Sequence, residues 1–272
     1  MIGALIIVFR EIIEAGLIVG ILLAATRSVS GSRVWIFGGV CLGLLGSAIV
    51  AGFTSFIAAA FEGYGQELFN AAILGAAVLM LIWHNLWMVR HGKGLAAGLK
   101  ETGKEIVSGK KTFWALALIV GTAVMREGSE VVLFLYGIAI NDGTTKLGML
   151  TGGLAGVVLG GGVSALTYLG MLNIPMRHFF TVTNGLITLL AAGMAAQAVS
   201  FLEQAGVANI FSQTIWNSSG ILSEKSIPGR ILHTLVGYAD QPTLLQLMAY
   251  LAVIAVIWIS SKAMRPAVVK QA

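Results

Sequence analysis

Charged residues and cysteine are both scarce in this sequence of 272 residues. Only 11% of the residues are charged, whereas a soluble domain usually carries about 25%. Such a composition cannot cover a water-facing surface, which all but excludes a soluble enzyme. The single cysteine, Cys41, lies inside an apolar run. Its solitary position excludes an internal disulfide framework and a cysteine-based metal site.

Long apolar runs dominate what is present. Hydrophobic residues make up 57% of the chain, and the mean hydropathy is +0.89. Several runs reach the ~20 residues that a helix needs to cross a bilayer. We therefore predict an all-α, polytopic protein embedded in a lipid bilayer. Breaks in hydropathy place seven transmembrane helices at about 2–25, 34–60, 68–89, 112–140, 147–172, 178–201 and 244–261.

Basic residues are divided unequally between the two sets of loops that seven spans create. Twelve lie in the set that includes the 90–111 loop, and three lie in the opposite set. Loops rich in Lys and Arg remain in the cytoplasm. This distribution predicts a multi-pass protein of the plasma membrane or bacterial inner membrane, with its N-terminus outside and its C-terminus cytoplasmic. It also accounts for the formal net charge of +5 without a nucleic-acid partner.

Two copies of one motif indicate an internal duplication. R-E-x-x-E occurs at 10–14 and again at 126–130, which is 116 positions later. Neighbouring features repeat at nearly the same offset. These are Gly39, Gly43 and Ser47 against Gly152, Gly156 and Gly160, and Asn70 against Asn184. Three spans separate the copies, so the copies cross the membrane in opposite directions, as in the inverted repeats of many transporters.

The predicted organisation is a 3+3 inverted repeat with one extra helix, all within a single transmembrane permease domain of residues 1–272. Its parts are repeat one (about 1–89), a cytoplasmic loop (about 90–111), repeat two (about 112–201), an outer loop (about 202–243) and a seventh helix (about 244–261). In the outer loop, apolar residues between Val207 and Trp216 recur at helical spacing. This pattern predicts an amphipathic helix on the outer face of the membrane.

Six ionisable residues interrupt the first and fourth spans, where each costs a few kcal/mol in the membrane. They are Arg10, Glu11, Glu14, Arg126, Glu127 and Glu130. The two glutamates of each motif are three residues apart and share one helix face. Each arginine precedes the second glutamate by four residues and can pair with it inside the helix.

Antiparallel packing of the two spans would bring the four carboxylates together at one depth in the membrane. Four negative and two positive charges leave a formal net charge of −2. A multivalent cation relieves the repulsion, and all-oxygen ligands suit hard cations. The alternative is that two self-neutralised Arg–Glu pairs only hold helices together. That alternative leaves two glutamates unpaired and does not explain the duplication.

Twin R-E-x-x-E motifs in the first and fourth of seven spans resemble the oxidase-dependent high-affinity iron permeases. This family includes the fungal plasma-membrane iron permeases and the bacterial EfeU-type proteins. The resemblance implies high-affinity iron uptake into the cell, with iron as the transported substrate and no cofactor. It implies Glu11, Glu14, Glu127 and Glu130 as metal ligands, with Arg10 and Arg126 tuning their charge. An iron-oxidising or iron-delivering partner protein outside the membrane is suggested only by the family.

Other functions remain open at this point. One is a permease for another hard divalent cation such as manganese. A second is a proton-relay or sensor protein whose carboxylates bind no metal. A membrane di-metal oxidase is disfavoured, because such sites use Glu-x-x-His motifs and no such motif occurs here. We therefore expect a transporter rather than an enzyme.

A few further acidic residues lie at the predicted outer ends of spans. They are Glu62, Glu67 and Asp142. They are candidates for an outer vestibule that concentrates cations. Ordinary solvated loop charges would look the same, and the sequence favours that simpler interpretation.

Overall fold

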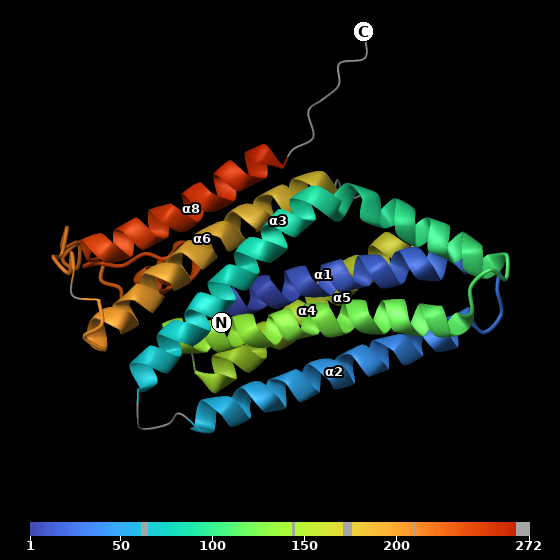
Figure 1. Ribbon diagram of the computed structural model, residues 1–272, viewed down its shortest axis with the longest axis horizontal. Coiled ribbons are helices and arrows are strands. Elements are labelled where there is room, and N and C mark those ends of the chain that lie inside the picture. The colour runs from blue at the N-terminus through green and yellow to red at the C-terminus, as the bar shows by residue number, and fades with distance from the viewer. Residues whose placement is uncertain (61–64, 143–144, 171–175, 209, 265–272) are drawn as a thin grey trace, which may run out of the picture. The chain divides into compact units, whose positions relative to one another are not determined.

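Every regular element in the part of the chain that the structure describes is a helix. The computed structural model describes residues 1–60, 65–142, 145–170, 176–208 and 210–264. Figure 1 shows these helices in chain order. Their bounds are α1 (Ile2–Ala25), α2 (Ser32–Ala60), α3 (Gln66–Val107), α4 (Phe113–Asp142), α5 (Lys146–Tyr168), α6 (Met176–Gln204), α7 (Ile227–Val236) and α8 (Leu244–Ala263).

Five of the described helices are long and apolar enough to cross a membrane, namely α2, α3, α5, α6 and α8. The motif-bearing helices α1 and α4 are not among them, because each carries the three charged residues of its motif near its middle. Large apolar side chains are exposed along α2, including Val34, Ile49 and Phe56 at 73–74% exposure. A water-facing helix rarely presents such a row of apolar side chains, whereas a lipid-facing helix does.

The described helices form two compact units that do not follow the two halves of the sequence. The first unit comprises Met1–Gln66 and Ala96–Thr183, and the second comprises Glu67–Leu95 and Asn184–Ala272. The first unit thus holds α1, α2, α4, α5 and the end of α3. Each unit takes helices from both predicted repeats.

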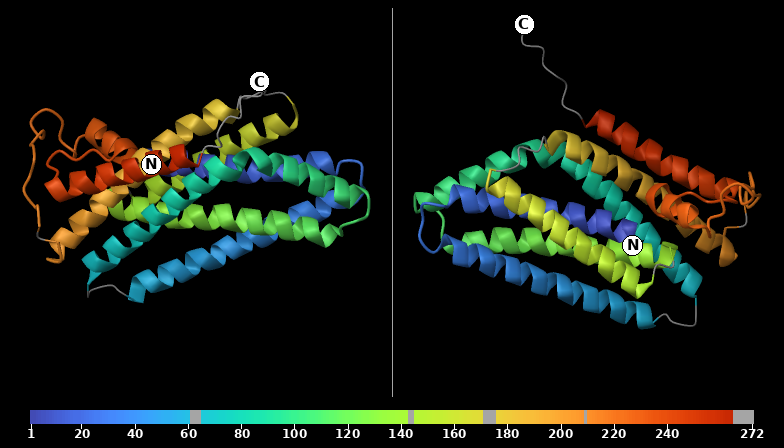
Figure 2. Two further views of the ribbon diagram at one scale, coloured as in Figure 1. Left: turned by 45° about the horizontal axis from the view of Figure 1, so that its top comes forward. Right: turned by 180° about the vertical axis from the view of Figure 1, so that it is seen from behind.

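Within the first unit, α4 packs along α2, while α1 packs along α5 and also contacts α4. Figure 1 and the rear view in Figure 2 both show α4 lying between α1 and α2. The two motif-bearing helices are therefore neighbours. Each also packs against a long, glycine-rich helix from the other half of the sequence.

Small residues let these helix pairs approach closely. A Cβ atom on Gly43 of α2 would lie 2.8 Å from the carbonyl oxygen of Gly121 in α4. A Cβ atom on Gly156 of α5 would lie 2.9 Å from the carbonyl oxygen of Leu5 in α1. Real Cβ atoms do not approach backbone oxygens so closely, so larger residues would push the helices apart. In these two helix pairs, a Cβ atom would come equally close to a backbone oxygen on the other side of the contact at Gly39, Gly152 and Gly160.

The second unit contains the start of α3 together with α6, α7 and α8. The side-chain amide of Asn85 donates a hydrogen bond of 3.2 Å to the hydroxyl of Thr188, which joins α3 to α6. Thr243 begins α8 with a capping box that it forms with Gln246. Both residues also donate hydrogen bonds to the carboxylate of Glu203 at the end of α6, at 2.8 and 3.0 Å. These contacts fix the start of α8 against α6.

One helix boundary differs from the prediction, and one local prediction was wrong. The segment predicted as a cytoplasmic loop at about 90–111 is helical as far as Val107, because α3 continues without a break. Its last turns bury Leu99 and Ile106. This burial stabilises a helix that hydropathy alone assigns to a loop. The amphipathic helix predicted around Val207–Trp216 is also absent among the described residues, since the helix of this region is α7, which begins after the Ser226 N-cap.

Candidate metal centre

The ionisable residues of α1 form a compact group of ion pairs. Arg10 reaches both glutamates of its own motif, with Nη1 2.9 Å from Glu11 Oε1 and Nη2 2.9 Å from Glu14 Oε1. All three side chains are buried, and that of Arg10 is only 1% exposed. The predicted pairing of Arg10 with Glu14 at a spacing of four is confirmed.

The second motif repeats this pairing in α4, with looser geometry. Arg126 Nε donates a hydrogen bond of 3.2 Å to Glu130 Oε1, and it lies 3.6 Å from Glu127 Oε1. Glu127 and Glu130 are buried, whereas the side chain of Arg126 is 38% exposed. The predicted pairing of Arg126 with Glu130 is confirmed. The two arginines, which are equivalent in the sequence, thus differ sharply in burial.

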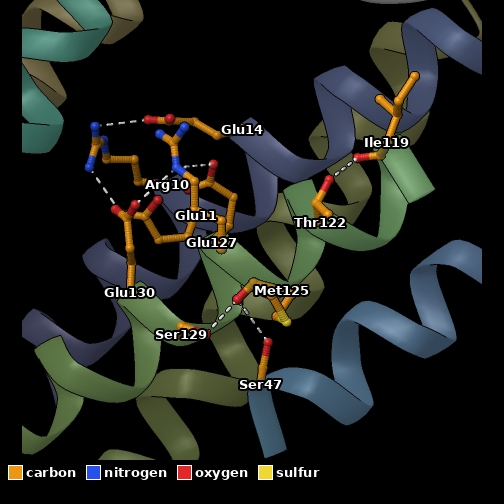
Figure 3. Close-up of polar contacts among 11 residues, drawn as sticks. Arg10, Glu11, Glu14, Ser47, Ile119, Thr122, Met125, Glu127, Ser129 and Glu130 are labelled. Atoms are coloured by element: carbon orange, nitrogen blue, oxygen red, sulfur yellow. Dashed lines mark hydrogen bonds and ion pairs between the residues drawn. The ribbon is translucent and has the colours of Figure 1, made fainter. Parts of the chain in front are cut away.

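The two motifs meet where α1 and α4 pack together. One carboxylate oxygen from each of Glu11, Glu127 and Glu130 lies within 4.8 Å of the others. Figure 3 shows these side chains pointing toward one another from the two helices. Glu14 does not belong to this closest group, but Arg10 connects it to Glu11. Three of the four predicted ligands are therefore close enough to share one ion.

The cluster is rich in buried oxygen atoms that a cation could use. Oε2 of Glu127 is buried and has no hydrogen-bond partner among the described residues. A buried carboxylate oxygen without a donor is costly, because it has lost its water and gained nothing in return. A bound cation would compensate for this loss. The arrangement can hold a hard cation through carboxylate oxygens, in a region enclosed by helices.

Close helix packing holds the second motif in position. The hydroxyl of Ser47 in α2 donates to the carbonyl oxygens of Gly43 at 3.0 Å and Met125 at 3.2 Å. It also contacts Gly128, where any side chain would collide with it. Gly128 lies between the two glutamates of the motif, and its small size lets this part of α4 pack closely against α2. Sequence analysis used Ser47 only as one of the features that repeat between the two halves, and it missed this contact.

The outer acidic residues do not form a described site. Asp142 is the last residue of α4 in the first unit. Glu67 is exposed in the first turn of α3 in the second unit. Glu62 lies outside the described residues. The outer vestibule therefore stays a prediction from the sequence.

Comparison with known proteins decides the family. The model of the "Iron permease FTR1 family" matches residues 1–264, which is nearly the whole chain. The chain belongs to this family. It is accordingly a multi-pass membrane protein of an iron-transporting permease family, as its apolar helices also indicate. The predicted resemblance to the iron permeases is confirmed.

Bacterial relatives agree with this assignment. The chain is 32% identical over 244 residues to the "Ferrous iron permease EfeU" of Escherichia coli O6:K15:H31, covering 87% of this chain and 86% of the relative. It is 30% identical over 249 residues to the protein of the same name from Yersinia pestis, covering 90% and 87%. No solved structure matches the chain.

Proposed function

We propose that this iron permease moves ferrous iron into the cell across the cytoplasmic membrane, through a site built from its two R-E-x-x-E motifs. The observation that carries this proposal is the meeting of Glu11, Glu127 and Glu130 within 4.8 Å. Carboxylate oxygens lie at roughly 2.0–2.6 Å from a hard cation. Two ligands on opposite sides of one ion are therefore about 4–5 Å apart. The spacing of the three oxygens fits one ion with small side-chain adjustments.

The charge of the cluster favours a divalent ion. Its four glutamates and two arginines sum to a formal charge of −2, which one Fe²⁺ ion would neutralise. The name of the Escherichia coli and Yersinia pestis relatives, ferrous iron permease, supports the same valence. We assign ligand roles to the four glutamates and a charge-tuning role to Arg10 and Arg126. Without the arginines, four carboxylates would hold the ion too tightly for release, whereas transport needs weak enough binding.

The proposal includes seven spans arranged as a 3+3 inverted repeat with an added helix. Its support is a correspondence between the two helix pairs of the first unit. The contact of Gly43 with Gly121 has its equivalent in the contact of Gly156 with Leu5. These pairs are related by the same offsets, 113 and 116, that relate the sequence features. Such repeats place a transported ion at the repeat interface, near the middle of the membrane.

The orientation in the proposal follows from the loop charges, with the N-terminus outside. Iron would then enter from the side where α1 begins and leave toward the side where α1 ends. In this orientation Arg10 and Glu14 lie about midway along α1. The ion therefore meets the carboxylates near the middle of the bilayer. At that depth the lipid offers no water, so charged ligands must replace the water molecules around the ion.

The test is uptake of radioactive iron into vesicles that contain the purified protein, with iron kept either ferrous or ferric. Glu→Gln substitution at each of the four positions removes one negative charge at nearly constant shape. We expect each to reduce ferrous uptake at least tenfold, which corresponds to about 1.4 kcal/mol of lost ion binding. Glu101→Gln, in an exposed part of α3, is the matched control and should transport normally.

Two outcomes would overturn the proposal. Wild-type uptake in all four variants would remove the carboxylates from the transport mechanism. Uptake of manganese at the same rate as iron, with mutual competition, would replace iron by a broader class of divalent cations. Bound metal, measured in purified protein before and after the substitutions, separates loss of binding from loss of movement.

A further inference from the structure

A cavity lies in the first unit at the end of α1 that is remote from its N-terminus. Its volume is about 460 Å³, within the range of small-molecule sites, about 300–1,000 Å³. Gly16, Gly20 and Ala24 line it on α1, one helical turn apart. Ser164, Thr167 and Tyr168 line it on α5. The missing side chain of Gly20 leaves space between the helices, whereas Gly16 packs directly against Ser164 of α5. The cavity begins two residues beyond Glu14 and is separate from the ion site.

Two lysines of α3 stand at the end of this cavity, Lys100 and Lys104. Their position follows from the packing of the last turns of α3. Leu99 and Ile106 are buried, and Gly103 contacts Ala25 at the end of α1. Since the lysines are four residues apart, they lie on one helix face. Neither lysine has an ion-pair partner within the described part of the chain.

The cavity is therefore amphipathic, with two ammonium groups at one end and small and apolar residues along its length. This combination excludes a second metal site, because the lysines repel cations. It fits a molecule with an anionic head and an apolar tail. Basic pockets between membrane helices bind the head groups of acidic lipids in this way. Lys100 and Lys104 follow the apolar span of α3, Gln66–Met88, by twelve and sixteen residues in the sequence, and so lie outside that span.

We propose that this cavity binds one acidic phospholipid, with its phosphate at Lys100 and Lys104 and the start of an acyl chain along Gly20. Each lysine near an anionic lipid surface contributes about a fivefold gain in affinity, and the two together contribute about thirtyfold. The lipid would join the ends of α1, α3 and α5. It would thereby stabilise the unit that carries the carboxylates.

The experiment uses the full-length protein in phosphatidylcholine bilayers with or without phosphatidylglycerol. It measures the lipid that stays bound after extraction, by native mass spectrometry. We expect wild-type protein to retain one phosphatidylglycerol. K100Q/K104Q removes both charges and should lose it. The control is K110Q, which removes an exposed charge of the same region that does not line the cavity. It should retain the lipid.

A second variant tests the space rather than the charge. The atom nearest to a Cβ on Gly20 would be the Cβ atom of Tyr168, at 3.8 Å. G20L therefore fills the cavity without a backbone collision. It should lose the lipid while keeping both lysines and the fold. Retention of the lipid by both G20L and K100Q/K104Q would overturn the proposal. Loss of the lipid from K110Q to the same extent as from K100Q/K104Q would also overturn it. Displacement of the lipid by inorganic phosphate alone would show a simple anion site and would also overturn it.

Discussion

The two arginines of the candidate metal centre should differ in their effect on stability, although the sequence makes them equivalent. Arg10 is 1% exposed and holds two buried carboxylates at 2.9 Å. Removing one partner from a buried ion pair costs about 3–5 kcal/mol, because an uncompensated charge stays behind. Arg126 is 38% exposed, and its contacts with the glutamates of its own motif are longer, at 3.2 and 3.6 Å. Its removal should cost about 1–2 kcal/mol, between a surface pair and a charged hydrogen bond.

The measurement is equilibrium unfolding of purified Arg10→Gln and Arg126→Gln protein in the same detergent. A difference of about 2 kcal/mol corresponds to about thirtyfold in the unfolding equilibrium constant. Adding Glu14→Gln to Arg10→Gln removes one of the stranded charges. This double variant should recover part of the lost stability. Equal losses in the two single variants would contradict the reasoning, as would strictly additive losses in the double variant.

Three further predictions concern packing, topology and capping. Gly43→Leu and Gly156→Leu should each destabilise the protein by about 1–3 kcal/mol or more through overpacking, measured by thermal unfolding. Gly161→Leu is the control and should not destabilise the protein, because Gly161 has open space around it. Equal effects of the three substitutions would contradict the helix contacts. In a Cys41→Ala background, cysteines in segments 108–111 and 217–220 should be labelled from opposite membrane sides. Thr243→Ala should cost about 1–2 kcal/mol through its lost cap, and Thr243→Ser should restore unfolding to the wild-type midpoint.

Much of the centre could be predicted from the sequence, because its geometry is local to single helices. The spacing of four between Arg10 and Glu14 determines their pairing in any α-helix. The two copies of the motif indicated an internal duplication, and antiparallel packing of the two spans predicted that the copies could meet. The family assignment followed from the same residues.

The remaining features depend on tertiary contacts that periodicity does not encode. The unequal burial of Arg10 and Arg126 arises from what packs around each helix. The helical course of 90–107 depends on Leu99 and Gly103 packing in the first unit. Apolar residues from Val207 to Trp216 have helical spacing, yet Phe211 has a positive φ of 61°. A β-bridge between Thr214 and Thr243 holds part of this segment extended instead.

The pairing of α1 with α5 and of α2 with α4 has a consequence for how the chain is made. About 120 residues must be synthesised after α1 before α5 begins, which takes on the order of ten seconds at ribosomal rates of about 5–20 residues per second. Throughout this interval α1 lacks its packing partner, although it already carries three charges. Arg10 can meet both of its glutamates within the same helix. The nascent α1 helix therefore enters the membrane with a counter-ion for its glutamates. It can remain there, partly neutralised, until the second half of the protein has been synthesised.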